Sequence, residues 1–153
     1  MIRRATTADI PRLIELLHQV NGVHHCLRPD LFKPHTTKYS ETQLAVLLTD
    51  DNSPVFVYAD TQVVGYAFCR IMAVNDDRLL QDRRTLYIDD LCVDQSQRGR
   101  HVGKALFDYV REYASFRECY NITLNVWEGN TPAKAFYQSI GMHVQKTGME
   151  IIL

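Results

Sequence analysis

Apolar residues recur along the chain at two spacings, and each spacing predicts a different kind of element. Over residues 10–20 they return every three or four positions, which is typical of a helix with one buried face. Thr7 or Asp9 can cap the first turn of this helix, and Asn21-Gly22 predicts its end. A second helix is expected over residues 40–48.

Shorter runs rich in β-branched and aromatic residues predict strands. These runs lie at residues 2–5, 55–59, 63–72, 85–93, 121–127 and 149–153. Two more helices are expected over residues 102–113 and 131–140, and Gly141 closes the second. Residues 24–39 and 75–84 are expected to be irregular connections. The order β-α-α-β-β-β-α-β-α-β predicts one domain over residues 1–153, of the α/β (α+β) class, with a mixed sheet between helices.

Composition narrows the classes of function. The 153 residues carry a formal net charge of −1, so nothing draws the whole chain to nucleic acid or anionic lipid. No run of 18 apolar residues could span a membrane, and the N-terminus lacks the apolar run of a signal peptide. The four cysteines include no CxxC pair and fit free thiols in a reducing compartment. We therefore expect a cytoplasmic protein with no nucleic-acid and no membrane partner.

A turn rich in glycine and basic residues separates the strand at 85–93 from the next helix. Its sequence is Gln97-Arg98-Gly99-Arg100-His101-Val102-Gly103-Lys104. A helix begins with four backbone N–H groups that lack partners, and about half a positive charge gathers there. Glycine lets such a backbone approach an anion closely. The turn therefore predicts a site for a phosphate or pyrophosphate, with simple solvated turn residues as the alternative.

Two nucleotide-binding motifs fail at this turn. The mononucleotide loop needs glycine five residues before Gly103 and serine or threonine after Lys104, where this chain has Arg98 and Ala105. The dinucleotide fingerprint needs glycine at three fixed offsets, and only Gly99 and Gly103 are present. An α/β protein that binds ATP through this turn stays as an alternative.

A second motif lies on the helix expected at 131–140. Its members form the series N-x-x-A-x-x-F-Y-x-x-x-G, and they are Asn130, Ala133, Phe136, Tyr137 and Gly141. Its apolar members are expected in the core. Tyr137 differs, because a buried hydroxyl needs a partner and a phenol can act as a general acid.

Together these segments resemble the GNAT superfamily of N-acetyltransferases, from Tyr87 through the turn at 97–104 to Gly141. The resemblance implies a mixed, mostly antiparallel sheet that is splayed in the middle and flanked by helices on both faces. The splay is expected between the strand that ends at Val93 and the strand that begins at Asn121. The resemblance also implies an acetyl-CoA-dependent N-acetyltransferase with acetyl-CoA as cosubstrate.

The same resemblance implies roles for the matching residues. The pantetheine arm of acetyl-CoA would pair with the backbone of Leu91, Cys92 and Val93, and Asn130 would bond the same arm. Tyr137 would lie near the thioester sulfur and protonate the departing thiolate. The pyrophosphate would lie on the backbone N–H groups of Arg98, Gly99, Arg100, Val102, Gly103 and Lys104.

His101 departs from the family pattern, which has glycine at this position. It still offers a backbone N–H, and a residue inside a helix needs no positive φ. We therefore expect His101 to remain part of the cofactor-binding turn. At low pH its imidazolium would add charge to the site, although an exposed ring is the simpler expectation.

The attacking amine must lose a proton, because an alkylammonium with a pKa of about 10.4 has no free lone pair. Asp89, Asp90 or a water relay can serve as the base. Adjacent strand residues face opposite sides, so only one carboxylate is expected to point into the cleft. Asp89 is preferred, since it matches the acidic residue near the acceptor in diamine-acetylating relatives. Pairing with Arg83 or Arg84 is the structural alternative.

Two further groups of side chains are expected to take no part in the chemistry. Cys92 could carry the acyl group in a ping-pong reaction, but no histidine lies nearby in the sequence to activate it. Direct attack by the amine is therefore expected. The run His24-His25-Cys26 looks like a metal cluster, but adjacent residues rarely converge on one ion, so we expect no metal.

The acceptor is expected to be a small-molecule or peptide amine. Residues 24–39 and 75–84 are expected to select it, and Asp76 and Asp77 would suit a cationic amine. A homodimer is compatible with the sequence. The main alternative function is a non-catalytic acyl-CoA-binding sensor or regulatory domain, which would need neither Tyr137 nor an acidic pair.

Overall fold

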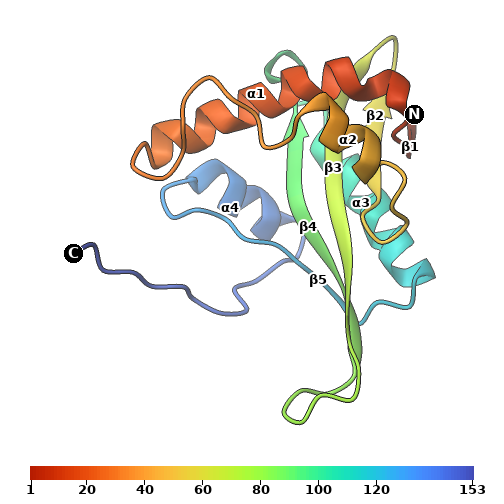
Figure 1. Cartoon of the computed structure of the whole chain (residues 1–153), viewed down its shortest axis with the longest axis vertical. Coiled ribbons are helices and arrows are strands. Elements are labelled where there is room, and N and C mark those ends of the chain that lie inside the picture. The colour runs from red at the N-terminus through yellow and green to blue at the C-terminus, as the bar shows by residue number, and fades with distance from the viewer.

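The computed structural model describes all 153 residues and has a five-stranded sheet at its centre (Figure 1). The strands are β1 (Ile2–Arg4), β2 (Val55–Ala59), β3 (Val63–Val74), β4 (Arg83–Val93) and β5 (Asn121–Thr123), in that spatial order. Neighbours pair antiparallel from β1 to β4, and β5 runs parallel to β4. The sheet is therefore mixed and mostly antiparallel, as the sequence predicted.

Helices cover both faces of the sheet. Four α-helices are present: α1 (Ile10–Leu27), α2 (Glu41–Leu47), α3 (Val102–Phe116) and α4 (Thr131–Ser139). On one face, Leu13 and Leu16 of α1 and Leu44 of α2 pack with Tyr66 and Phe68 of the sheet. A second core cluster on the other face packs α3 against the sheet through residues that include Phe107, Val110, Ala67 and Ile88. The predicted α/β (α+β) layering is confirmed.

The N-terminal helix is longer than the sequence predicted. The expected end at Asn21-Gly22 is wrong, because α1 continues to Leu27. One glycine costs a helix only about 1 kcal/mol, which its neighbours can offset. In the last turn the His24 ring packs against Phe32 at 5.0 Å, and His25 Nδ1 hydrogen-bonds the Phe32 carbonyl at 2.7 Å. These contacts secure the turn that follows the glycine.

The sheet opens between β4 and β5. Only Thr85–Tyr87 of β4 pair with Asn121–Thr123 of β5, although β4 itself continues to Val93. The six residues after Tyr87 therefore have no strand on their β5 side. This confirms the predicted splay, and it explains why the strand expected at 121–127 ends at Thr123.

Residues 149–153 form no strand, so that prediction is wrong for the single chain. They belong to an extended C-terminal segment that leaves the body of the molecule beyond α4 (Figure 1). None of the helices is both long enough and apolar enough to cross a membrane.

Candidate active site

A β-bulge in β4 places two carboxylates on the same face of the sheet. Phe68 of β3 pairs with Asp90 and the next residue, Cys69, pairs with Ile88, so Asp89 is the extra residue. A bulge interrupts the alternation of side chains along a strand. The expectation that only one of Asp89 and Asp90 could point into the cleft is therefore wrong.

The carboxylate of Asp90 accepts a hydrogen bond from a buried phenol. The hydroxyl of Tyr66, which is fully buried, donates a 2.6 Å hydrogen bond to Asp90 Oδ2. Burial raises the pKa of Asp90 to about 6, against the opposing effects of the Tyr66 bond and the Lys38 charge. Burial also raises the pKa of Tyr66, so the phenol stays protonated and keeps donating.

Asp89 holds an ammonium group. Lys38 Nζ donates to Asp89 Oδ2 at 2.5 Å, and the Tyr39 hydroxyl donates to the same oxygen at 3.3 Å. Both donors come from the segment between α1 and α2, which the sequence predicted to line the acceptor site. Burial alone would lower the pKa of Lys38, but the bond to Asp89 and its charge raise it.

Tyr137 on α4 faces the end of β4 across the opening in the sheet. Burial raises its pKa first, and the charges of Asp90 and Cys92 raise it further. Tyr137 is therefore a neutral phenol at physiological pH. Its hydroxyl makes no hydrogen bond within the chain, so its proton is free for another acceptor. The resemblance implied a place for Tyr137 near the thioester sulfur, and in the fold the phenol lies within reach of the charge of Asp90.

Cys92 is a buried thiol. Its Sγ lies 3.8 Å from the carbonyl oxygen of Leu16, to which it donates. Burial, with the charge of Asp90, raises the pKa of Cys92 to about 12. The thiol is therefore protonated at neutral pH and is a poor nucleophile, which agrees with its expected packing role.

The turn before α3 presents a row of free backbone donors. The N–H groups of residues 99–104 donate to no acceptor in the chain, and the first bonded amide of the helix is Ala105, to the His101 carbonyl at 3.0 Å. Arg98 N–H donates weakly to the Gln95 carbonyl at 3.5 Å. Gly99 adopts a φ of +80°, which glycine accepts without strain. Unpaired amides at a helix start form an anion site.

His101 adopts the left-handed conformation, with φ +60° and ψ 14°, as the N-cap of α3. The expectation that this residue needs no positive φ is therefore wrong. It precedes the helix and turns the chain into it. A non-glycine residue in this conformation costs roughly 1–2 kcal/mol, which gives a physical reason for the family's glycine.

Two basic side chains of the turn are engaged locally. Lys104 Nζ pairs with Asp108 at 2.6 Å, and Arg100 donates to Gln97 at 2.8 Å. Arg98 has no ion pair, and its charge acts on the Cys92 thiol. Among these three basic side chains, Arg98 is therefore the one that makes no hydrogen bond within the chain.

Gly103 lies where α3 approaches α4 and the end of β4, and Asn130 begins α4. A Cβ on Gly103 would lie 3.4 Å from the ring of Phe136 on α4 and 3.6 Å from Val93. Asn130 caps α4, its side-chain oxygen accepting from Ala133 N at 3.4 Å. Its NH2 group makes no hydrogen bond. Leu91 to Val93 run between these elements with their β5-side backbone free.

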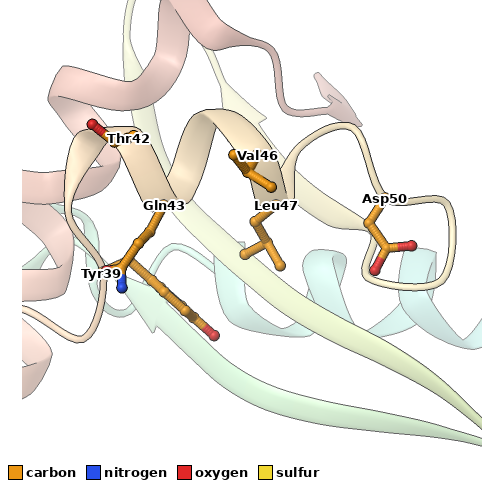
Figure 2. A pocket seen from close by; sticks show the side chains of 6 residues that line it. All are labelled: Tyr39, Thr42, Gln43, Val46, Leu47 and Asp50. Carbon is orange, nitrogen blue, oxygen red and sulfur yellow. The ribbon is translucent and has the colours of Figure 1, made fainter.

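Two surface hollows lie outside this centre. One hollow lies along α2, and its lining residues are Tyr39, Thr42, Gln43, Val46, Leu47 and Asp50 (Figure 2). Of these only Tyr39 touches the acidic pair, so we assign this hollow no part in the site. A polar hollow beside the turn is lined in part by Gln97, Arg100 and Val102.

Some expected contributors lie elsewhere. The loop at 75–82 is at the far end of the β3–β4 hairpin (Figure 1), about 23 Å along the strand from Asp90 at 3.3 Å per residue. There Asp77 accepts from the N–H groups of Leu79 and Leu80 at 2.8 Å. The run His24-His25-Cys26 diverges on α1, and no group of three or more potential ligands could hold a metal.

Lys38, Tyr39 and Tyr66 were missed as individual residues by the sequence reasoning. Tyr66 sits in a strand of ordinary apolar pattern, and no motif distinguishes it from core. Lys38 and Tyr39 lie in an irregular connection whose path no local pattern fixes. Residues 24–39 were expected to help select the acceptor, but only the fold shows that Lys38 and Tyr39 contact Asp89 and that Tyr66 contacts Asp90.

Comparisons with known proteins agree with this geometry. The model of the acetyltransferase (GNAT) family matches residues 20–142. A crystal structure of a mutant BH1408 protein from Bacillus halodurans is 32% identical and superposes with a TM-score of 0.96, covering 100% of this chain and 99% of that one. A Trypanosoma brucei acetyltransferase is 22% identical, with a TM-score of 0.72 and coverages of 100% and 99%.

A third similar structure is an aminoglycoside acetyltransferase from an uncultured soil metagenomic sample, in complex with sisomicin. It is 18% identical, with a TM-score of 0.75, and covers 100% of this chain and 94% of that one. At this identity the likeness shows the fold alone. The fold and the family match define an enzyme class that transfers acyl groups. The chain belongs to the GNAT family of acetyltransferases, as its motifs predicted.

Proposed function

We propose that this chain, as one domain over residues 1–153, transfers an acetyl group from acetyl-CoA to a primary amine by direct attack. The observation that carries the proposal is the row of unpaired N–H groups at residues 99–104. Such donors at a helix start suit a diphosphate. All four cysteines are free, and we place the reaction in the cytoplasm, where thiols stay reduced.

The chain's residues fit the diphosphate and the pantetheine of acetyl-CoA. The backbone of Leu91, Cys92 and Val93 would pair with the pantetheine amides as an added strand does, and Asn130 has an NH2 group free for the same arm. When bound, acetyl-CoA supplies the thioester carbon that the amine attacks. The diphosphate would accept from the N–H groups of Gly99, Arg100, His101, Val102, Gly103 and Lys104, beside the side chain of Arg98.

Asp89 and Asp90 would have different roles toward the acceptor amine. Asp89 would hold the incoming ammonium, in the way that it holds Lys38 Nζ. Asp90, with a pKa of about 6, is ionised at pH 7.5 and would take the proton that the amine must lose, directly or through a water. Asp89 thus stays in contact with the reacting amine, and Asp90 becomes the favoured base.

Tyr137 would give its proton to the departing thiolate. Its raised pKa keeps the phenol protonated until the sulfur becomes strongly basic. Cys92 remains a thiol through the cycle, so no acyl group need pass to it. The amine therefore attacks the thioester directly. Asp90 would take the proton that the amine loses, and Tyr137 would give a proton to the departing thiolate.

The acceptor is a primary amine that arrives as a cation, on a small molecule or a peptide. The Lys38 ammonium on Asp89 supports this class, because the acceptor's charge would replace it. The aromatic ring of Tyr39 lies 5.6 Å from the same ammonium and favours a cation. A sensor that binds acyl-CoA without turnover is the alternative.

The experiment that tests the function is release of free thiol from acetyl-CoA in the presence of a panel of primary amines. Thiol release that depends on at least one amine supports the enzyme. Binding of CoA with no release across the panel would support the sensor. Thermal stabilisation by ATP without a response to CoA would favour a nucleotide-binding protein.

A further inference from the structure

Lys38 occupies the place that the proposed function gives to the acceptor amine. Its Nζ donates to Asp89 Oδ2 at 2.5 Å, and the ring of Tyr39 lies 5.6 Å from the same nitrogen. A lysine side chain is itself a primary alkylamine, with an ordinary pKa of about 10.4. The chain therefore carries an amine of the acceptor's own class at the carboxylate that would hold the acceptor.

The backbone around Lys38 is held against the sheet. The ring of Tyr39 stacks on Phe68 of β3, with centroids 5.6 Å apart and 23° between the planes, and Figure 2 shows it pointing from its segment toward the strands. Phe68 pairs with Asp90 in the sheet. Ser40 follows as the N-cap of α2. Lys38 is therefore positioned beside the acidic pair by packing, and not by its ion pair alone.

The ammonium of Lys38 reaches the site from solvent. Its side chain is 47% exposed, whereas the side chain of Asp89 is only 14% exposed. The stem of a lysine is flexible, so the head group can move while the backbone stays in place. Against the effect of burial, Asp89 and then Asp90 raise the pKa of Lys38. The nitrogen is therefore an ammonium at neutral pH and needs a base before it can attack a thioester.

The groups that serve an added amine are also near Lys38. Asp90, the favoured base, is close enough to Lys38 for the two charges to act on each other. After burial, the charge of Asp90 is also the largest cause that raises the pKa of Tyr137, the proposed acid. One carboxylate thus acts on both the nitrogen of Lys38 and the phenol that would protonate the leaving thiolate.

We propose that Lys38 is an acetylation site of this chain and that its own active site modifies it in cis, an inference that rests on the proposed function. The Lys38 nitrogen gives one proton to Asp90 and forms a bond to the carbonyl carbon of acetyl-CoA. The bond from that carbon to sulfur breaks, and the thiolate leaves with the electron pair and takes a proton from Tyr137. The proton on Asp90 returns to Tyr137 through solvent, so the products are CoA and acetylated Lys38.

The reaction should stop after one acetyl group per chain. Acetylation removes the charge of a lysine and its ability to form a salt bridge, so the product no longer pairs with Asp89. A tethered amine meets its site at an effective concentration on the order of millimolar. Lys38 should therefore react when acetyl-CoA is present and free acceptor is scarce.

The test is mass spectrometry of the full chain after incubation with acetyl-CoA and no added amine. The chain should gain the mass of one acetyl group, located on Lys38 by peptide mapping, at a rate that does not depend on chain concentration. Lys38→Arg keeps the positive charge but offers no amine, so it should gain none. Lys134→Arg is the matched control, because Lys134 is exposed on α4 and its side chain has no partner in the chain. This control should be acetylated as fast as the parent.

A mixture of two variants separates reaction in cis from reaction in trans. Tyr137→Phe retains Lys38 but lacks the acid, and Lys38→Arg retains the acid. In the mixture, acetylation of Lys38 should be at least about tenfold slower than in the parent. The parent's rate in the mixture would overturn the proposal. Acetylation of Lys38 no faster than that of the other lysines would be simple chemical reaction and would overturn it as well.

A binding measurement without acetyl-CoA tests whether Lys38 occupies the acceptor's place. Lys38→Gln frees Asp89, so it should bind butylamine roughly two- to fivefold more tightly than the parent in an NMR titration, the ratio expected from loss of a competing exposed ion pair. Equal affinities would contradict the proposal. A chain that acetylates an added amine but never Lys38 overturns this inference and leaves the proposed function intact. A chain that acetylates neither, and does not bind CoA, contradicts both.

Discussion

The Tyr66 hydroxyl donates a 2.6 Å hydrogen bond to Asp90 Oδ2, and it does so where the bulge in β4 turns Asp89 toward the same face. The bulge therefore brings two carboxylates together, and each accepts a hydrogen bond from a different tyrosine. Tyr66 donates to Asp90, and Tyr39 donates to Asp89. The pair differs in environment, since Asp90 has a raised pKa. Two carboxylates in different surroundings can take different roles in one reaction.

Tyr66→Phe should shift the acid limb of the pH–rate profile upward. The Tyr66 bond stabilises the Asp90 carboxylate, so its loss raises the pKa of Asp90 above about 6. The measurement is kcat/KM for amine acetylation between pH 5 and pH 9, where activity requires ionised Asp90. Tyr120→Phe, at an exposed tyrosine, is the control. If the acid limb of Tyr66→Phe falls at the same pH as that of the parent, Asp90 is not the base.

Asp90→Asn should lower activity and raise stability at neutral pH. The pKa of Asp90 is higher in the folded chain than in the unfolded chain, so the folded state prefers the protonated form. Its contribution to stability is complete below about pH 4 and is lost as the pH rises through about 6. The amide avoids this loss, with an expected gain of about 1–3 kcal/mol at pH 8.

The free energy of unfolding in urea at pH 4 and at pH 8 checks this prediction. The two proteins should differ little at pH 4, and Asp90→Asn should be the more stable at pH 8. A variant that is less stable than the parent at pH 8 would show that the ionised carboxylate does not strain the fold.

Tyr137→Phe should reduce turnover at least tenfold, because a general acid usually contributes about 100–10,000-fold to the rate. CoA affinity should be nearly intact, because the diphosphate site lies on the backbone of residues 99–104. Steady-state kcat and a calorimetric Kd for CoA separate the two effects. An unchanged kcat would take Tyr137 out of the chemistry.

His101→Gly should stabilise the fold. Relief of the left-handed conformation gains roughly 1–2 kcal/mol, and the extra freedom of glycine in the unfolded chain returns roughly 0.5–1 kcal/mol. We expect a net gain of about 0.5–1 kcal/mol in the free energy of unfolding. Gly99→Ala, at a φ of +80°, should move stability the other way. A destabilised His101→Gly would mean that the imidazole makes contacts that outweigh the strain.

Local patterns predicted the elements of the fold well where each element follows its own periodicity. Residues 55–59 form β2 as expected, and Ser40 caps α2 through a reciprocal bond with Gln43. These features depend on short-range rules that a single sequence carries.

The remaining features depend on long-range geometry. The bulge at Asp89 follows from how β3 and β4 pair, and nothing in the β4 sequence marks it. The left-handed His101 was missed because its place just before α3, rather than inside it, decides its φ. The contact of Lys38 with Asp89 joins residues 51 positions apart. The tail at 149–153 has a strand pattern, but a strand needs a partner that this single chain does not supply.

The central claim is that the free amides before α3 bind the diphosphate of CoA, and calorimetry of CoA binding tests it most directly. We predict measurable heat with CoA and much weaker binding of pantetheine, which lacks the diphosphate. Absence of heat at millimolar CoA, or equal affinity for CoA and pantetheine, would contradict the account.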